Sequence, residues 1–191
     1  SAHAPSHRLA GLSGSLNCCK PVLSIVNRLS YEERDEVRRT MRILLATDGS
    51  EFSEAAVDEI AQRPFPKGSE VRVLSVFELP AFPVAVPWAG VDFDDEVQKH
   101  LQAQARKAVK SAVRKLRAGK EGSKLKVSTK ILAGSAKQTI LEEAEASNAD
   151  LIVLGSHGRG RMGRFLLGSV SLAVVTHAEC SVEVVRRHPS A

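Results

Sequence analysis

Short apolar runs alternate with amphipathic stretches from Met41 to about Arg187, and this alternation most limits the possible fold. The runs are strand-sized and rich in Val, Ile and Leu, as strands buried on both faces are. They cover residues 42–47, 71–77, 125–132, 150–155 and 181–186. Strand and helix in alternation predict a three-layer α/β sandwich with a parallel sheet and right-handed crossovers.

The stretches between the strands have helical spacing. From Glu96 to Leu116, apolar residues recur every three or four positions, which predicts a helix with one buried stripe. Ser135 to Gln138 has the pattern of a capping box, in which a hydroxyl and an amide satisfy each other's backbone donors. Another helix is expected to start around Ser169 and to run toward Cys180.

Composition narrows the classes of protein. A chain of 191 residues with 43% hydrophobic residues is expected to build one core, and no run approaches the ~18 apolar residues of a membrane span. The net charge of +5 is mild and the basic residues are spread along the sequence, so no dedicated nucleic-acid surface is expected. Three cysteines cannot all pair with one another, which favours a reducing compartment and a cytoplasmic location.

Residues 1–40 differ in character from the rest. Positions 1–31 contain no Asp or Glu, and a charged stretch leads from there to Met41. Three interpretations compete: an organellar transit peptide, a flexible tail, or upstream sequence that is not native coding sequence, with Met41 as the true start. We favour the third, and we expect one domain over 41–187 and a short tail over 188–191.

Two strand ends point to a ligand site. In an open α/β sheet, ligands bind at the carboxyl ends of strands where the strand order reverses. Asp48 ends the first strand and Gly155 the fourth, so the two tips face one crevice if these strands are neighbours. A carboxylate there can accept hydrogen bonds from two ribose hydroxyls. The alternative is that Asp48 only turns the chain before Ser50, because Asp-Gly is a common turn signal.

The segment 155–171, "GSHGRGRMGRFLLGSVS", contains five glycines and three arginines. Glycines allow the backbone N–H groups to form a concave anion site, and the start of a helix at Ser169 adds positive partial charge. The hydroxyls of Ser169 and Ser171 are expected to add donors. The alternative is an ordinary flexible surface loop, in which Arg161 and Arg164 face solvent rather than phosphates.

Other nucleotide motifs fit less well. Residues 158–163 satisfy G-x-G-x-x-G, and Glu183 lies about 20 residues further on, where a ribose-binding acid is sought. That fingerprint belongs after the first strand of a βαβ series, whereas here only one strand follows. Dinucleotide binding is therefore the less favoured alternative. The P-loop pattern G-x-x-x-x-G-K-[ST] does not occur in the sequence, which excludes a P-loop NTPase.

The spacing Gly155-x2-Gly158-x9-Gly168-Ser169 resembles the nucleotide motif of the ATP-binding subgroup of the universal stress protein family. The segments "ILLATDGSEFSEAAVDEIA" and "THAECSVEVVR" resemble the family's opening and closing segments, so the resemblance covers nearly all of 41–187. It implies a five-stranded open parallel sheet, flavodoxin-like in outline, with ATP in the crevice. Ser181 departs from the family pattern, which usually has a proline after the cysteine.

The resemblance also implies which residues surround the nucleotide, with Asp48 on the ribose and the backbone of Val76 against adenine. The residues implied to line the adenosine are Ala46, Thr47, Asp48 and Val76. Those implied to surround the phosphates are Gly155, Gly158, Arg159, Gly168, Ser169, Val170 and Ser171. His157 is expected to hold the loop through a hydrogen bond. The family often forms homodimers through its last strand, here 181–186.

These expectations predict an ATP-binding regulatory protein of the stress response, with Mg2+ accompanying ATP and with slow or no hydrolysis. No second acid is placed by motif beside the phosphates, so no catalytic or metal-ligating residue is assigned. A weak ATPase that uses His157, or a scaffold that binds no nucleotide, is the alternative. The loop 78–96, which contains Trp88, is a lid over adenine, or else a packing loop or a second interaction surface.

Overall fold

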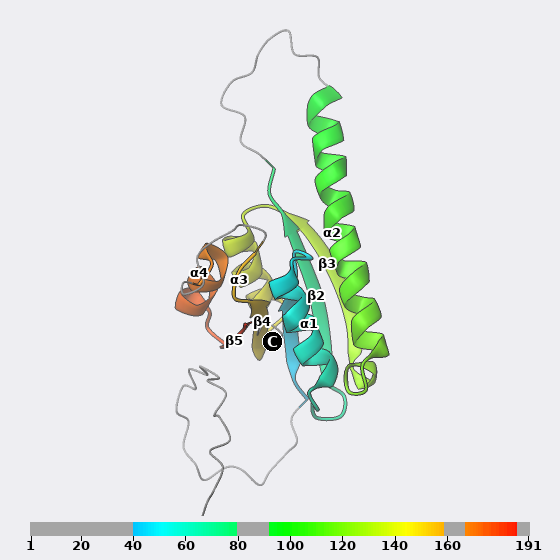
Figure 1. Cartoon of the computed structure of the whole chain (residues 1–191). Coiled ribbons are helices and arrows are strands. Elements are labelled where there is room, and N and C mark those ends of the chain that lie inside the picture. The colour runs from blue at the N-terminus through cyan, green and yellow to red at the C-terminus, as the bar shows by residue number, and fades with distance from the viewer. Residues whose placement is uncertain (1–39, 80–91, 159–166, 187–191) are drawn as a thin grey trace, which may run out of the picture.

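Five strands form one sheet in the computed structural model, which describes residues 40–79, 92–158 and 167–186 (Figure 1). The strands are β1 (Arg42–Ala46), β2 (Glu70–Phe77), β3 (Lys126–Ala133), β4 (Leu151–Gly155) and β5 (Ser181–Val185). The helices are α1 (Glu51–Gln62), α2 (Asp92–Ala118), α3 (Ala136–Ala146) and α4 (Ser169–His177), with a short 3-10 helix at Gly122–Lys124. Every predicted strand boundary lies within one residue of the observed one.

The strand order is β3-β2-β1-β4-β5 and every pairing is parallel. The chain therefore builds outward from β1 to β3, returns to the other side of β1, and continues to β5. This arrangement confirms the predicted α/β sandwich with an open five-stranded parallel sheet. The first and fourth strands are neighbours, which meets the condition for a shared crevice, and the strand order reverses between β1 and β4.

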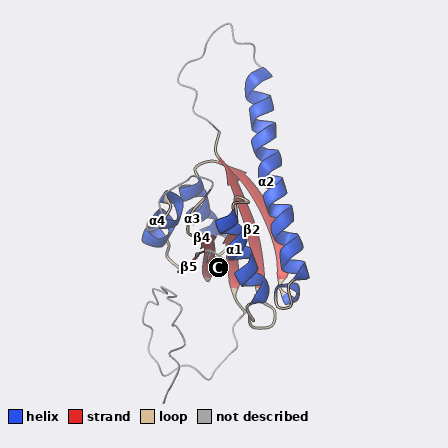
Figure 2. Cartoon of the chain, viewed as in Figure 1, coloured by secondary structure: helices blue, strands red, loops and turns tan. Residues whose placement is uncertain are grey.

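Helices cover both faces of the sheet (Figure 2). Side chains alternate along a strand, so Ile43 and Leu45 join the core beneath α1 and α2, while Leu44 joins the core beneath α3 and α4. All three are at most 2% exposed. A strand buried on both faces must be apolar throughout, which explains the run "ILL" in β1.

Two predictions about helix starts need correction. The predicted capping box is not formed, because Ser135 occupies the N-cap of α3 but its side chain makes no capping hydrogen bond. Instead the Glu78 carboxylate accepts a hydrogen bond from the backbone N–H of Ala136 at 2.7 Å. The predicted loop 78–96 is shorter than expected, since α2 begins at Asp92.

Several predictions lie outside the described residues. These include the nature of 1–39, the tail after 187, and the position of Trp88. They stay predictions. Within the described parts of the chain, no helix is both long and apolar enough to cross a bilayer.

A buried carboxylate joins α3 to the sheet. The side chain of Glu143 is 3% exposed and accepts hydrogen bonds from Arg72 of β2, at 2.6 Å, and from Lys130 of β3. Burial by itself raises the pKa of this carboxyl, but the hydrogen bonds and charges of Lys130 and Arg72 outweigh that effect. The pKa of Glu143 therefore lies below its ordinary value of 4.5.

We expect Glu143→Gln to lower the free energy of unfolding by about 1–3 kcal/mol at pH 7, because two charged hydrogen bonds are weakened. A carboxyl with a lowered folded-state pKa stabilises the fold fully above its unfolded-state pKa, and that contribution is lost as the pH falls through the folded-state value. The difference between wild type and Glu143→Gln should therefore shrink below about pH 4.5. Denaturant titrations at several pH values measure it.

Glu142→Gln is the matched control, since Glu142 is the exposed neighbour on the same helix. It should change the unfolding free energy by less than about 0.5 kcal/mol at any of these pH values. Equal effects of the two substitutions would contradict a special role for the buried carboxylate.

Candidate functional site

A pocket lies at the carboxyl edge of the sheet, where β1, β2 and β4 end and where α3 and α4 begin. Eleven of the twelve residues predicted to contact a nucleotide line it, and the twelfth, Arg159, lies outside the described residues. The eleven are Ala46, Thr47, Asp48, Val76, Gly155, His157, Gly158, Gly168, Ser169, Val170 and Ser171. The pocket spans the reversal point between β1 and β4, where open α/β sheets bind their ligands.

Asp48 makes the turn that the alternative interpretation proposed. Its Oδ1 accepts a hydrogen bond from the Ser50 N–H at 3.0 Å, and Gly49 takes the left-handed backbone conformation with φ 76°. Ser50 then caps α1 by accepting from the Ser53 N–H. This turn fixes the carboxylate at the pocket, with Oδ2 on the side of Gly158.

Thr47 fastens the tip of β1 to its neighbours. Its backbone N–H donates to the Leu74 carbonyl of β2 at 2.9 Å, and its hydroxyl donates to Ser53 Oγ at 3.2 Å. Thr47 is 5% exposed and Ser53 is 4% exposed. The first turn of α1 is thereby locked to the end of β1.

The two ends of the glycine-rich segment meet. The Gly168 N–H donates to the Ser156 carbonyl at 2.8 Å, and α4 begins directly after Gly168. Gly168 offers no side-chain cap, and the first N–H groups of a helix have no acceptor within the helix. The start of α4 therefore supplies backbone donors and positive partial charge at the pocket, as an anion site requires.

The predicted donor role of the Ser171 hydroxyl is wrong. Ser171 is buried, and its hydroxyl donates to the Gly155 carbonyl at 2.8 Å and lies 3.3 Å from the Ser156 carbonyl. Its proton thus ties α4 to the end of β4. Ser169 differs, because it is exposed at the pocket.

His157 is held by its neighbours in the loop. Its Nδ1 shares a hydrogen bond with Ser156 Oγ at 3.1 Å, and its ring centroid lies 5.1 Å from that of Phe52. Its Nε2 is buried and has no hydrogen-bond partner among the described residues. These contacts fit the predicted structural role of His157.

Five pocket-lining residues, four apolar and one serine, were not predicted from the sequence. The missed lining residues are Ser53, Leu74, Ala136, Ile140 and Leu154. Strand alternation was the available signal, since Leu74 lies two residues before the predicted Val76 and so shares its face of the sheet. Ala136 and Ile140 are one helical turn apart on α3, but only the packing of α3 shows that they reach the pocket.

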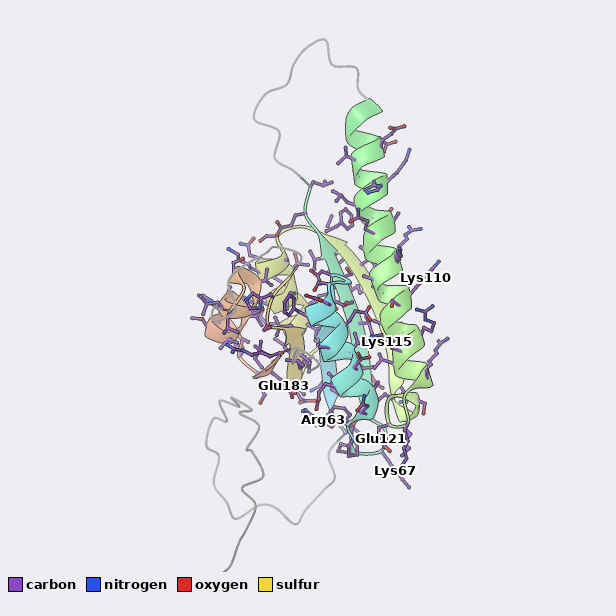
Figure 3. All side chains as sticks on the ribbon, viewed as in Figure 1. Arg63, Lys67, Lys110, Lys115, Glu121 and Glu183 are labelled. Carbon is purple, nitrogen blue, oxygen red and sulfur yellow. The ribbon has the colours of Figure 1, made fainter. Side chains whose placement is uncertain are left out.

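Glu183 was the candidate acid for binding the ribose of a dinucleotide, but its side chain pairs with Arg63 outside the pocket. It lies within β5 opposite Val153, and its carboxylate binds both terminal nitrogens of Arg63, at 2.5 and 2.7 Å. Figure 3 shows Arg63 at the end of α1 close to Glu183. Glu183 is not among the pocket-lining residues, so the dinucleotide alternative loses its recognition acid.

Metal-ligating clusters do not occur in the parts of the chain that the structure describes, where no three His, Cys, Asp or Glu residues lie close enough to share an ion. Asp48 is the single carboxylate among the described residues that line the pocket. The pocket thus combines one acid, a helix start and apolar walls.

Comparisons with known proteins agree with this architecture. The model of the universal stress protein family matches residues 40–186. Universal stress protein MJ0531 of Methanocaldococcus jannaschii is 33% identical over 147 residues, which cover 76% of this chain and 82% of that protein.

Solved structures give the same result. The universal stress protein UspA from Lactobacillus plantarum is 30% identical, with a TM-score of 0.62 over 78% of this chain and 99% of that one. MJ0577 of Methanocaldococcus jannaschii is 28% identical, with a TM-score of 0.64 over 78% of this chain and 98% of that one. The fold and the order of its elements are therefore shared with these proteins.

Gly155 is expected to be intolerant of any side chain. A Cβ there would lie 2.5 Å from the carbonyl carbon of Phe52 and 2.7 Å from the Ser53 nitrogen, both backbone atoms of α1. We expect Gly155→Ala to lower the free energy of unfolding by about 1–3 kcal/mol, because the helix must shift away from β4. Chemical denaturation measures the loss.

Gly158→Ala is the control. Its Cβ would lie 3.1 Å from Asp48 Oδ2, the movable end of a side chain, and Gly158 is exposed. We expect a change of less than about 0.5 kcal/mol. If Gly155→Ala is as stable as Gly158→Ala, the close approach of α1 to β4 does not constrain the fold.

Proposed function

This chain belongs to the universal stress protein family, and we propose that it is a nucleotide-dependent regulatory module that binds ATP. The observation that carries the proposal is the pocket at the reversal point, with Asp48 at one tip and the start of α4 at another. One carboxylate for ribose hydroxyls, a helix start for phosphates and apolar walls for a base match the three parts of a nucleotide.

The chemistry of each part supports this assignment. Leu74, Val76 and Ile140 offer apolar contact to a purine base. The backbone N–H groups at the start of α4 suit phosphate oxygens, because they need acceptors that the helix does not supply. Mg2+ would accompany ATP through phosphate oxygens and water, as it commonly does.

A universal stress protein structure from Arabidopsis thaliana contains AMP. It is 19% identical to this chain with a TM-score of 0.55, so the likeness is one of fold. The proposal for this chain rests on its own pocket.

The pocket is directly connected to the edge strand β5 through the end of β4. Gly155 lies opposite Val185 in the β4–β5 pairing, and the Ser156 N–H donates to the Val185 carbonyl at 2.9 Å. β5 is an edge strand with half-buried valines, and such edges pair readily with another chain. We propose that β5 forms a homodimer and that nucleotide occupancy alters this surface.

We further propose that ATP turnover is slow or absent. Phosphoryl transfer needs charge stabilisation and a positioned nucleophile, whereas the described lining offers the single carboxylate of Asp48. The other titratable lining residue, His157, already bonds to Ser156 through Nδ1. A cytoplasmic location stays a prediction from the odd number of cysteines.

The proposed role of Asp48 is tested by titrating ATP and 2'-deoxy-ATP into wild type and into Asp48→Asn. Wild type should prefer ATP by about tenfold or more, because a hydrogen bond to a charged acceptor contributes about 1.5–3 kcal/mol. In Asp48→Asn the preference should fall below about threefold, while the amide oxygen can still accept from Ser50 and keep the turn. Isothermal titration calorimetry measures all four affinities.

Asp150→Asn is the matched control, because Asp150 accepts from Arg42 at the opposite, amino end of the strands. It should keep the full preference for ATP. An unchanged preference in Asp48→Asn would show that the carboxylate does not contact the ribose. If neither nucleotide binds wild type, the protein is a scaffold that binds no nucleotide. If His157→Ala loses ATP hydrolysis but keeps its affinity for ATP, the protein is an ATPase that uses His157.

A further inference from the structure

The outer face of α2 carries a dense positive charge. From Lys99 to Lys120 the sequence contains eight Lys and Arg residues and no Asp or Glu. Such a segment is unusual in a chain whose net charge is only +5. Folding decides where these charges lie, because a helix distributes consecutive residues around its axis.

The helix gathers five of the cations on the side away from the sheet. Residues such as Val109, Ala112 and Leu116 are buried against the sheet and α1. Arg106, Lys110, Arg114 and Arg117 follow one another at spacings of four, four and three residues, so they share one face, and Lys107 lies beside them. All five are exposed, and we name this set the basic stripe: Arg106, Lys107, Lys110, Arg114 and Arg117.

The cations of the basic stripe are not neutralised by the described parts of the protein. None of the five forms an ion pair with a described residue. Lys115 on the same helix contrasts with them, because it pairs with Glu54 and Asp58 of α1. Figure 3 shows Lys110 pointing away from the molecule, whereas Lys115 lies on the side of α1.

A shallow depression runs between these side chains. It is lined by Ala103, Arg106, Lys107, Lys110, Ser111 and Arg114. The small side chains of Ala103 and Ser111 leave room for an anionic group between the cations, and guanidinium groups can bind phosphate oxygens in pairs.

The residues that line this depression favour a nucleic acid over a protein as the partner. Specific protein interfaces depend on a core of aromatic or large apolar side chains, and none lines this depression. A nucleic acid needs no such core, because neutralised phosphates supply most of the affinity of nonspecific binding. From Arg106 to Arg117 the helix rises about 17 Å, and over that length of duplex axis each strand carries about five phosphates.

We propose that the basic stripe of α2 binds the phosphate backbone of a nucleic acid without reading its sequence. A net charge of only +5 over the whole chain gives no reason to expect a nucleic-acid surface, whereas α2 aligns five cations of one short segment on a single face. The proposal does not depend on ATP binding, because the basic stripe and the pocket share no residue.

The experiment measures binding of the full chain to a fluorescent 20-base-pair duplex by anisotropy between 20 and 200 mM salt. Five phosphate contacts predict a slope of about −4 to −5 in a plot of log K against log salt. Lys110→Gln/Arg114→Gln should reduce that slope by about 2 and weaken binding at least about tenfold at the lowest salt.

Lys67→Gln/Lys126→Gln is the matched control, because it removes the same charge from exposed lysines at the amino ends of β2 and β3. It should retain more than about half of the wild-type affinity. Circular dichroism confirms that both double variants fold. The result expected is a loss confined to the α2 variant.

Several results would overturn the proposal. One is that the wild-type chain does not bind the duplex at 20 mM salt. Another is that both double variants lose the same affinity for the duplex, which would mean that the net charge of the chain, and not the basic stripe, determines binding. Stripe-dependent binding that is as tight to polyglutamate would assign the surface to an acidic protein. Stripe-dependent binding that is as tight to vesicles with 30% phosphatidylserine would assign it to a membrane.

Discussion

The parallel pairing of β1 with β4 is the interaction on which the pocket depends. It places Asp48, at the end of β1, beside the end of β4, although the two segments are about a hundred residues apart in sequence. The absent side chain at Gly155 lets the first turn of α1 come against β4, and Ser171 ties α4 to the same point. Polar groups at the end of β1, at the end of β4 and at the start of α4 therefore surround one pocket, which no side chain fills.

Much of the fold could be predicted because local patterns determine it. Runs such as "ILL" and "LIVL" identify buried strands, and the spacing in α2 identifies a helix, so only boundaries moved by a few residues. The donors and acceptors of single side chains could not be predicted. Ser171 and Ser135 illustrate this, since tertiary neighbours decided that one hydroxyl bonds to Gly155 and the other caps nothing.

Site residues that belong to a sequence motif were predicted, whereas residues that reach the pocket only through tertiary packing were not. Glycines and Asp48 have a sequence signature, whereas Ile140 lines the pocket only because α3 packs over the ends of β1 and β2. The basic stripe is hidden for a different reason, because its five cations lie within residues 106–117 of a chain whose total charge is only +5. Charge counts for a whole chain therefore say little about one surface.

Binding of ATP in the pocket between β1 and β4 is best tested by isothermal titration of ATP with Mg2+ into wild type and into Gly158→Val. A Cβ added at Gly158 would lie 3.1 Å from Asp48 Oδ2, and the two methyl groups of the introduced valine would extend further. We predict one ATP bound per wild-type chain and none bound to a folded Gly158→Val protein. Equal binding by both proteins, or by neither, would show that ATP does not bind in this pocket.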